Sequence, residues 1–254
     1  MANLRIIAAD LHGTAALTAS SAAMPVANTQ NPLRSYPWRS TSAAVQTISA
    51  TLTASVGGGA GLVLTNTNLR TTATVSAALK DGGVTVNTVS LTCLGSNLDG
   101  TTTWHAWFDD TGIDGYTLTL TDTGNPAGYL QVVQILCGEY ITTEYNVAYG
   151  AGLTLLEDVT AIETAGLSLR TEGTGDVRRV LTVEHEFLLE ADRAALIDAL
   201  VGAGRKATLF VSLYPGEGGA KERDHQFPAR RMADLSATHW TSQFWRGREE
   251  FREV

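Results

Sequence analysis

The stretch from Asp114 to Gly150 constrains the fold of this chain most strongly. Two runs in it, Tyr116–Thr121 and Tyr129–Leu136, have the β-branched and aromatic content of strands. Between them, Asp122–Gly128 contains the Gly, Pro, Asn and Asp residues that shape tight turns. The first run alternates apolar and threonine side chains, whereas the returning run is apolar almost throughout, which is typical of a strand buried on both faces. We therefore predict a hairpin over Asp114–Leu136 in the middle of an antiparallel β core.

Short strand-like runs separated by turn signals recur along the rest of the chain. Clear examples are Val45–Val56, Thr72–Leu79, Val84–Leu94 and Trp104–Phe108. Regular short strands with glycine-rich turns indicate an all-β sandwich or jelly roll.

The region after residue 150 is less regular. Val177–Phe187 is predicted as a long strand of mixed charge, while Leu153–Leu169 stays undecided, with a strand at Thr164–Leu169 as one option. The one predicted helix covers Glu190–Val201, because acidic residues occupy its first turn, an apolar face repeats at helical spacing, and glycines follow it. The expected fold is therefore a β-sandwich with one late α-helix.

The charge balance disfavours a nucleic-acid partner. Eighteen basic and 26 acidic residues give a net charge of −8, and charged residues make up only 17% of the chain. A nucleic-acid-binding protein normally presents a basic face. No apolar run approaches the roughly 20 residues that span a bilayer, so we expect no membrane insertion and no cleaved leader. The composition is more typical of a structural or extracellular module than of a metabolic enzyme.

Cys93 and Cys137 are the only cysteines. Both lie in apolar, strand-like runs, so two buried free thiols are favoured, and a single disulfide stays open as an alternative.

Candidate catalytic and metal-binding groups do not converge. On a strand, His185 faces away from Glu184 and Glu186, so this triplet cannot hold one ion. Asp109, Asp110 and Asp114 could hold calcium through oxygen ligands, but turn chemistry explains them more simply. No serine lies in a nucleophile-elbow motif, no phosphate loop is present, and no pair of carboxylates is singled out for glycosidase chemistry. We expect a protein that is not an enzyme and needs no cofactor and no metal.

Core packing is the favoured interpretation for most of the tryptophans. Trp104 and Trp107 cannot share a strand face, so one is expected inside and the other outside. An exposed tryptophan could stack on a sugar or anchor a protein partner.

Several stretches, in order along most of the chain, resemble a family of structural tail proteins of long-tailed, double-stranded DNA bacteriophages. That family carries a galactose-binding-like (discoidin-like) jelly roll. The stretches that carry the resemblance are Asn31–Ser40, Leu62–Arg70, Asp122–Val132, Leu136–Tyr140, Tyr145–Gly150, Leu181–Leu200 and Thr208–Pro215.

The resemblance implies a virion component of the tail tip or baseplate, made in the host cytoplasm. Its partners would be other tail or baseplate proteins and copies of itself. The alternative is a carbohydrate- or receptor-binding tail module that recognises a host surface glycan. We expect residues 1–150 to form the galactose-binding-like jelly roll and residues 151–254 to form a strand-helix-strand extension packed on it, or one continuous domain.

Two segments are predicted to contact partners. Pro25–Arg39 contains Tyr36, Trp38 and Arg39, which are residue types typical of interface anchors. Gly216–Arg230 is polar and glycine-rich, so it would become ordered on docking. The alternative for both segments is an ordinary solvated loop.

Overall fold

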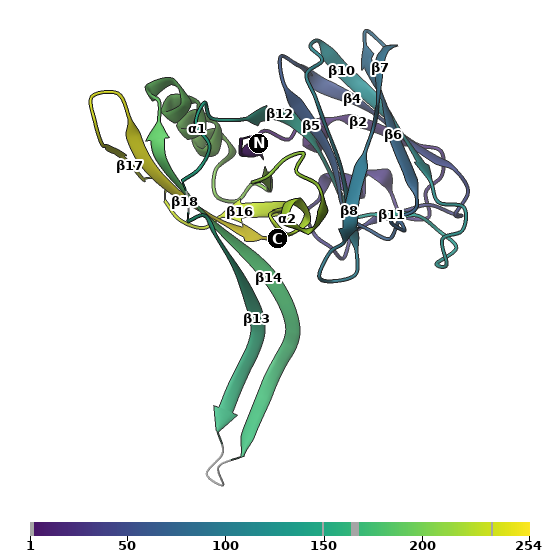
Figure 1. Ribbon diagram of the computed structural model, residues 1–254. Coiled ribbons are helices and arrows are strands. Elements are labelled where there is room, and N and C mark those ends of the chain that lie inside the picture. Colours follow the sequence, from purple (N-terminus) through teal and green to yellow (C-terminus); the bar gives the residue numbers. More distant parts are fainter. Residues whose placement is uncertain (1–2, 149, 164–167, 235) are drawn as a thin grey trace.

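The computed structural model describes residues 3–148, 150–163, 168–234 and 236–254. It shows a β-rich body from which one long hairpin projects (Figure 1). All of the strand pairings in the described chain are antiparallel. The all-β class, the sandwich and the late helix are thus confirmed.

The largest sheet runs through the whole body in the order β13-β14-β18-β16-β15-β1-β12-β5-β9-β8, with β17 added beside β18. Its strands are β1 (Arg5–Ile7), β5 (Ala60–Thr67), β8 (Thr92–Ser96), β9 (Thr102–Phe108), β12 (Gln134–Ile141), β13 (Gly152–Glu163), β14 (Leu169–Leu188), β15 (Leu209–Ser212), β16 (Gln226–Arg231), β17 (Ser236–His239) and β18 (Trp245–Glu253).

A second sheet has the order β2-β4-β10-β6-β7, and a short pair joins β11 to β3. These strands are β2 (Ala16–Ala19), β3 (Trp38–Arg39), β4 (Gln46–Val56), β6 (Thr74–Asp81), β7 (Val84–Ser90), β10 (Ile113–Thr121) and β11 (Gln131–Val132). The helices are η1 (His12–Thr14) and η2 (Val26–Gln30), which are 3-10 turns, and α1 (Glu190–Ala203) and α2 (Gly219–Asp224).

The first core lies between the second sheet and the β12-β5-β9-β8 part of the large sheet. Ile48 and Leu118 from one sheet and Leu62, Trp104 and Ile135 from the other belong to this apolar cluster. Alternation along each strand points these side chains inward. This half of the molecule is the sandwich predicted from the strand pattern.

The second core lies under α1. Leu196 and Leu200 of the helix are buried against Leu181, Phe227 and Phe251 of the large sheet. The helix begins at Glu190 as predicted and continues to Ala203.

The N-terminal strand β1 links the two halves of the molecule. It pairs with β12 on one side and β15 on the other, so the large sheet is continuous between the two cores. Ile7, Val63, Leu136 and Phe210 form a small apolar cluster on the opposite face of this junction. The domain division at residue 150 stays a prediction.

The predicted hairpin over Asp114–Leu136 is wrong. β10 pairs with β4 and β6 in the second sheet, whereas β12 pairs with β1 and β5 in the large sheet. The connection between them therefore crosses from one layer of the sandwich to the other. Turn residues indicate that the chain reverses, but they do not say whether the returning strand joins the same sheet.

Two smaller predictions have clear outcomes, one for the cysteines and one for Trp104 and Trp107. Cys93 and Cys137 are both free, although only Cys137 is fully buried. Trp104 lies in the sandwich core while Trp107 packs on the other face, edge-on to Tyr140. Among the described residues, no helix is long and apolar enough to cross a membrane.

Candidate interaction surface

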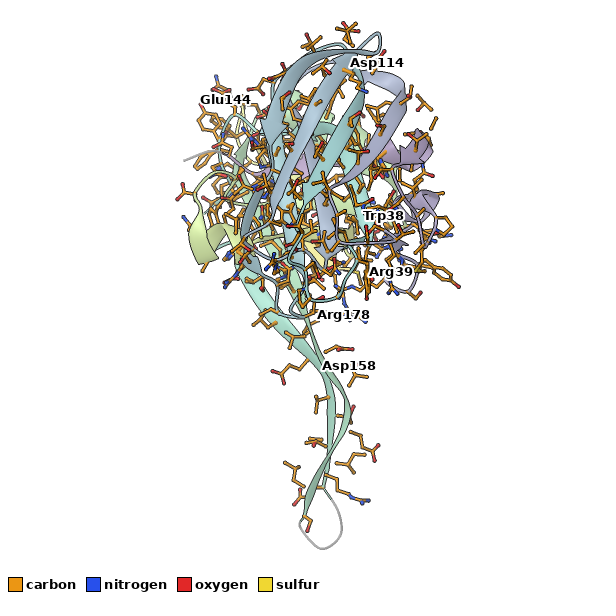
Figure 2. All side chains as sticks on the ribbon, turned by 90° about the vertical axis from the view of Figure 1, so that its right-hand side faces the viewer. Trp38, Arg39, Asp114, Glu144, Asp158 and Arg178 are labelled. Carbon is orange, nitrogen blue, oxygen red and sulfur yellow. The ribbon has the colours of Figure 1, made fainter. Side chains whose placement is uncertain are left out.

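The hairpin of β13 and β14 forms an arm that leaves the body. The two strands pair from Gly152–Thr182 at the base to Glu163–Leu169 at the far end. On its other side β14 pairs with β18 only from Val180 onward, so within the described chain residues 169–179 of β14 pair with β13 alone. The arm is therefore a two-stranded ribbon beyond Arg178, as Figure 2 shows.

A β-bulge bends the arm near its middle. Pairing shifts between Glu157 and Val159, and Gly173 lies opposite the bulge with a φ of 142°. A Cβ atom at Gly173 would lie 2.0 Å from the carbonyl oxygen of Asp158. Only glycine fits this backbone approach, so the sequence itself specifies the bend.

Apolar side chains on the arm are exposed to solvent. The exposed fractions are 53% for Leu155, 40% for Leu156, 42% for Val159, 46% for Ile162 and 70% for Leu169. An isolated two-stranded ribbon is marginally stable in water, and an exposed apolar surface of this kind marks an interaction site. The arm is thus a ribbon whose exposed apolar side chains have no covering layer within the described chain.

The arm is also acidic. Between Glu157 and Asp176 it has five acidic residues and one basic residue, Arg170. All six are exposed, and none takes part in an ion pair within the described chain. The surface offered by the arm therefore combines apolar groups with uncompensated negative charge.

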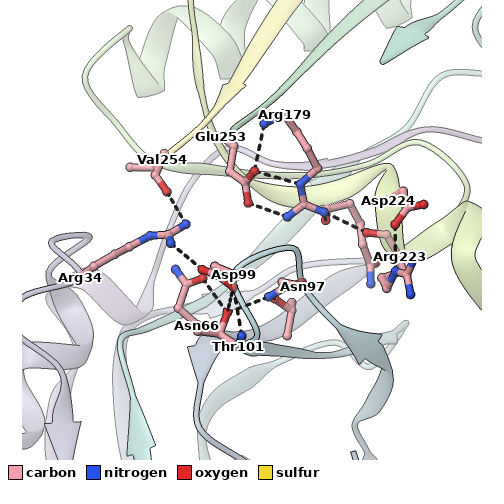
Figure 3. A network of polar contacts seen from close by, with 12 residues as sticks. Arg34, Asn66, Asn97, Asp99, Thr101, Arg179, Arg223, Asp224, Glu253 and Val254 are labelled. Atoms are coloured by element: carbon pink, nitrogen blue, oxygen red, sulfur yellow. Dashed lines mark hydrogen bonds and ion pairs between the residues drawn. The ribbon is translucent and has the colours of Figure 1, made fainter. Parts of the chain in front are cut away.

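A buried ion pair fixes the base of the arm. The Arg179 Nη2 atom lies 2.6 Å from Glu253 Oε1, and the Arg179 Nε atom donates to Glu253 Oε2 at 2.9 Å (Figure 3). The Arg179 guanidinium also donates to the carbonyl of Arg223 at 3.0 Å and lies over the ring of Phe227. A bidentate pair in a buried position orients both strands strongly, so the arm projects from a well-defined root.

A second contact ties the sandwich to the end of the large sheet beside this root. Arg34 Nη1 lies 2.6 Å from Asp99 Oδ2, and Arg34 Nη2 donates to the carbonyl of Val254 at 3.1 Å (Figure 3). Burial opposes ionisation of Asp99, but hydrogen bonds from Thr101 and the Arg34 charge outweigh it and lower its pKa.

The three residues predicted as interface anchors do not form one surface. Tyr36 is 53% exposed, but Trp38 is 0% exposed and lies in the sandwich core, where its Nε1 donates to the carbonyl of Ser21 at 3.2 Å. Arg39 is half-buried and stacks over the ring of Tyr129 at 4.1 Å. The prediction for Trp38 is corrected: β3 pairs with β11, which turns this ring inward. Tyr36 stays a predicted contact residue.

The prediction that Gly216–Arg230 is a loop that orders on docking is also wrong. Within the chain this segment forms α2 and most of β16. The buried Glu222 carboxylate accepts hydrogen bonds from the amides of Gly216 at 2.9 Å and Gly218 at 2.8 Å, and it lies 3.3 Å from His105 Nε2. Burial raises the pKa of Glu222, but these partners outweigh the burial and lower it. One buried carboxylate therefore orders the glycine-rich segment against β9.

A cluster of titratable groups lies at the start of the chain. His12 Nε2 contacts Thr29 Oγ1 at 2.8 Å, and the Tyr116 hydroxyl contacts His12 Nδ1 at 2.6 Å. Burial lowers the pKa of His12 to about 3 and raises the pKa of Asp10 to about 6, although backbone amides including that of Cys137 donate to Asp10. These contacts hold the first turn on the sandwich, so we interpret the cluster as structural.

The remaining candidates for chemistry do not form a common site. Asp109 accepts from the Tyr140 hydroxyl, Asp110 from Asn87 Nδ2 and Asp114 from the Gly82 amide, so each carboxylate has its own partner. Among the described residues, no group of three or more His, Cys, Asp and Glu side chains could hold a metal ion.

The predicted direction of the His185 side chain is confirmed, but the sequence did not predict its neighbour Glu249. His185 is buried and faces away from the exposed Glu184 and Glu186. Its Nε2 lies 3.2 Å from Oε2 of Glu249 on the neighbouring strand β18. Sequence spacing could not reveal this pair, because the two residues are far apart along the chain.

The arm was the main feature that the sequence did not reveal. Its signal was present as two runs rich in Thr, Val and charged residues on either side of residues 164–167, which lie outside the described part of the chain together with most of the possible strand at Thr164–Leu169. The runs do not alternate between apolar and polar residues, because neither face of the arm is covered.

No protein-family model and no curated protein matches the chain. Among solved structures, the lectin domain of lectinolysin complexed with Lewis B antigen matches at 11% identity and a TM-score of 0.39, covering 52% of this chain and 96% of that one. A chitosan-binding module from the chitosanase/glucanase of Paenibacillus sp. IK-5 matches at 15% identity and a TM-score of 0.39, covering 51% of this chain and 98% of that one. The Clostridium perfringens protein CpGH89CBM32-5, complexed with GalNAc-β-1,3-galactose, matches at 13% identity and a TM-score of 0.38, with coverages of 51% and 99%. Likeness at this level carries no conclusion about what this chain binds.

Proposed function

We propose that this chain is a non-enzymatic structural subunit that assembles with copies of itself through the arm. The observation that carries the proposal is the ribbon of β13 and β14, whose apolar side chains are exposed on both strands. Burying the exposed parts of these five side chains would contribute roughly 5 kcal/mol of hydrophobic free energy, against which the entropic cost of association counts. A neighbouring subunit could bury these side chains, since symmetric assembly repeats one favourable contact in every copy.

The place of this assembly in the cell is the second part of the proposal. The sequence resembles tail proteins of long-tailed bacteriophages, so we place the subunit in a virion, at the tail tip or baseplate, after synthesis in the host cytoplasm. Other tail proteins would then be its further partners. Immunogold electron microscopy of phage particles that carry the gene should label the tail tip, and particles without label would contradict this placement.

Shortening the arm tests the self-assembly. Leu156 and Arg178 are directly opposite in the ribbon, so replacing residues 157–177 with Asn-Gly closes the hairpin with a two-residue turn. We expect the full chain to form assemblies in sedimentation velocity and the shortened chain to stay monomeric. The melting temperatures should agree within a few degrees, because neither core is changed. Equal assembly of both chains would contradict the proposal.

The alternative is a carbohydrate- or receptor-binding tail module. The observation that favours it is Tyr36, a ring that is 53% exposed in a loop with Arg34, whose side chain is 45% exposed. Exposed aromatic rings can stack on sugars. A glycan array should then show binding by the wild-type chain that Tyr36→Ala removes, and the absence of any bound glycan would contradict this function.

A further inference from the structure

The large sheet has an arginine-bearing outer face next to the root of the arm. Val180 of β14, Arg252 of β18 and Arg230 of β16 lie side by side across three strands. Residues paired directly across strands share a face, so these side chains point the same way. The alternate residues Leu181 and Phe251 are fully buried under α1. The arginines therefore lie on the face opposite the helix.

Near the arm, the arginines on this face form no ion pair in the described chain, although Glu250 shares the face two residues before Arg252 on β18. Arg230 and Arg252 are directly opposite each other, an arrangement of like charges that destabilises a sheet. Neither residue takes part in an ion pair within the described chain, and the Nε atoms of both are buried without a hydrogen-bond partner there. Arg178, exposed at the root of the arm, likewise has no ion pair among the described residues.

The other end of the same face is different. There Arg248 lies 3.7 Å from Glu184 and Arg246 lies 4.0 Å from Glu186, so opposite charges face each other across β18 and β14. On this face, the arginines without an ion pair in the described chain thus lie near the arm, where a partner with negative charge would pair with them.

The arm has the complementary chemistry. Its five acidic residues between Glu157 and Asp176 lack ion pairs in the described chain, and they lie on both faces of the ribbon among exposed apolar side chains. The segment Leu156–Glu163 spans roughly 25 Å at about 3.3 Å per residue, which is more than enough to cross three strands about 4.8 Å apart. The arm of each copy points away from the body of that copy (Figure 1). The arm that reaches this face therefore belongs to another copy.

We propose that the arm of one copy docks on the outer face of β14, β18 and β16 of the next copy, with its carboxylates against Arg178, Arg230 and Arg252. This inference rests on the proposed function, because it needs self-assembly through the arm. The contact joins two different surfaces, so it is heterologous and builds a ring when the rotation closes and a filament when it does not. Its charged part sets the orientation of the arm and weakens as ionic strength rises.

Charge reversal in both surfaces tests the docking. The face variant is Arg230→Glu/Arg252→Glu, and the arm variant is Glu157→Lys/Glu163→Lys. Glu172 is left unchanged because it pairs with Thr160 and so lies on the other face of the ribbon from Glu163. Each variant is expected to raise the dissociation constant of self-association at least about tenfold. Combining all four substitutions in one chain should restore assembly, because each interface then joins a basic arm to an acidic face.

The controls separate this proposal from folding and from the proposed function. Lys80→Glu/Lys206→Glu changes the net charge by the same amount as the face variant and should leave assembly unchanged. A second comparison uses Arg230→Gln/Arg252→Gln, which removes the two positive charges without reversing them. This variant should weaken assembly less than the face variant does. Circular dichroism and melting temperature verify that each variant folds.

Each result has a distinct meaning. If the shortened arm still permits assembly, the proposed function fails. If the shortened arm prevents assembly but the face variant assembles with wild-type affinity, some other molecule covers the arginine face and only the docking proposal is overturned. A folded four-substitution chain that stays monomeric would overturn it as well.

Discussion

At the scale of single residues, Asp10 couples stability to pH. Its pKa is raised from 3.8 to about 6 by burial, so the folded chain holds this proton more tightly than the unfolded chain. Asp10 therefore contributes stability that is fully present below pH 3.8 and is lost as pH rises through about 6. His12 acts in the opposite direction, because burial lowers its pKa to about 3. Its effect is that the folded state loses stability relative to the unfolded state as pH falls below 6.5.

Asp10→Asn isolates the first effect. The amide oxygen can still accept from the amides of His12 and Cys137, but it does not titrate. We expect the variant to gain roughly 2–3 kcal/mol relative to wild type between pH 4 and pH 7. Urea unfolding at a series of pH values measures this difference, and parallel curves for the two proteins would show that Asp10 is not perturbed.

Two neighbouring residues of α1 test the second core. Leu200 is 1% exposed and Val201 is 60% exposed. Leu200→Asp should cost several kcal/mol and abolish soluble folding, because it places an unpaired charge among apolar side chains. Val201→Asp is the matched control and should change the free energy of unfolding by less than about 1 kcal/mol. Equal effects of both changes in soluble expression and urea unfolding would mean that the helix is packed differently.

At the scale of an element, the segment from Gly216 to Asp224 depends on one carboxylate. Removing the Glu222 side chain leaves His105 and the amides of Gly216 and Gly218 without their acceptor. Glu222→Ala should therefore lower the free energy of unfolding by about 2–4 kcal/mol and speed hydrogen exchange at the two glycine amides.

The control for this element lies in the same segment. Glu217 pairs with Lys221 near the surface at 3.5 Å, so Glu217→Ala should cost less than about 1 kcal/mol. If Glu222→Ala unfolds at the same urea concentration as this control, the carboxylate does not hold the segment in place.

At the scale of the whole molecule, we expect folding without a metal ion. Asp109, Asp110 and Asp114 each accept a hydrogen bond from a different partner, so calcium would have to displace three contacts to bind them together. The melting temperature should be the same with and without EDTA, since a ligand that binds only the native state would raise it. A drop on adding EDTA would support the calcium site.

The sequence by itself determined the features that depend on neighbouring residues. Alternation placed Trp104 and Trp107 on opposite faces and turned His185 away from Glu184 and Glu186, because side-chain direction on a strand has a period of two. Helical spacing and flanking glycines located α1, and the frequency of turns indicated a sandwich.

The tertiary structure alone decided which strands meet. β10 and β12 join different sheets, β1 joins the C-terminal strands, and Trp38 is buried because β3 pairs with β11. The candidate interaction surface was also decided by the tertiary structure. Arg230 and Arg252 become neighbours only when β16 pairs with β18. The arm is exposed because β14 extends beyond the end of its pairing with β18. Partner choice and burial depend on contacts between residues far apart in the chain, and these are fixed by packing of the whole sheet.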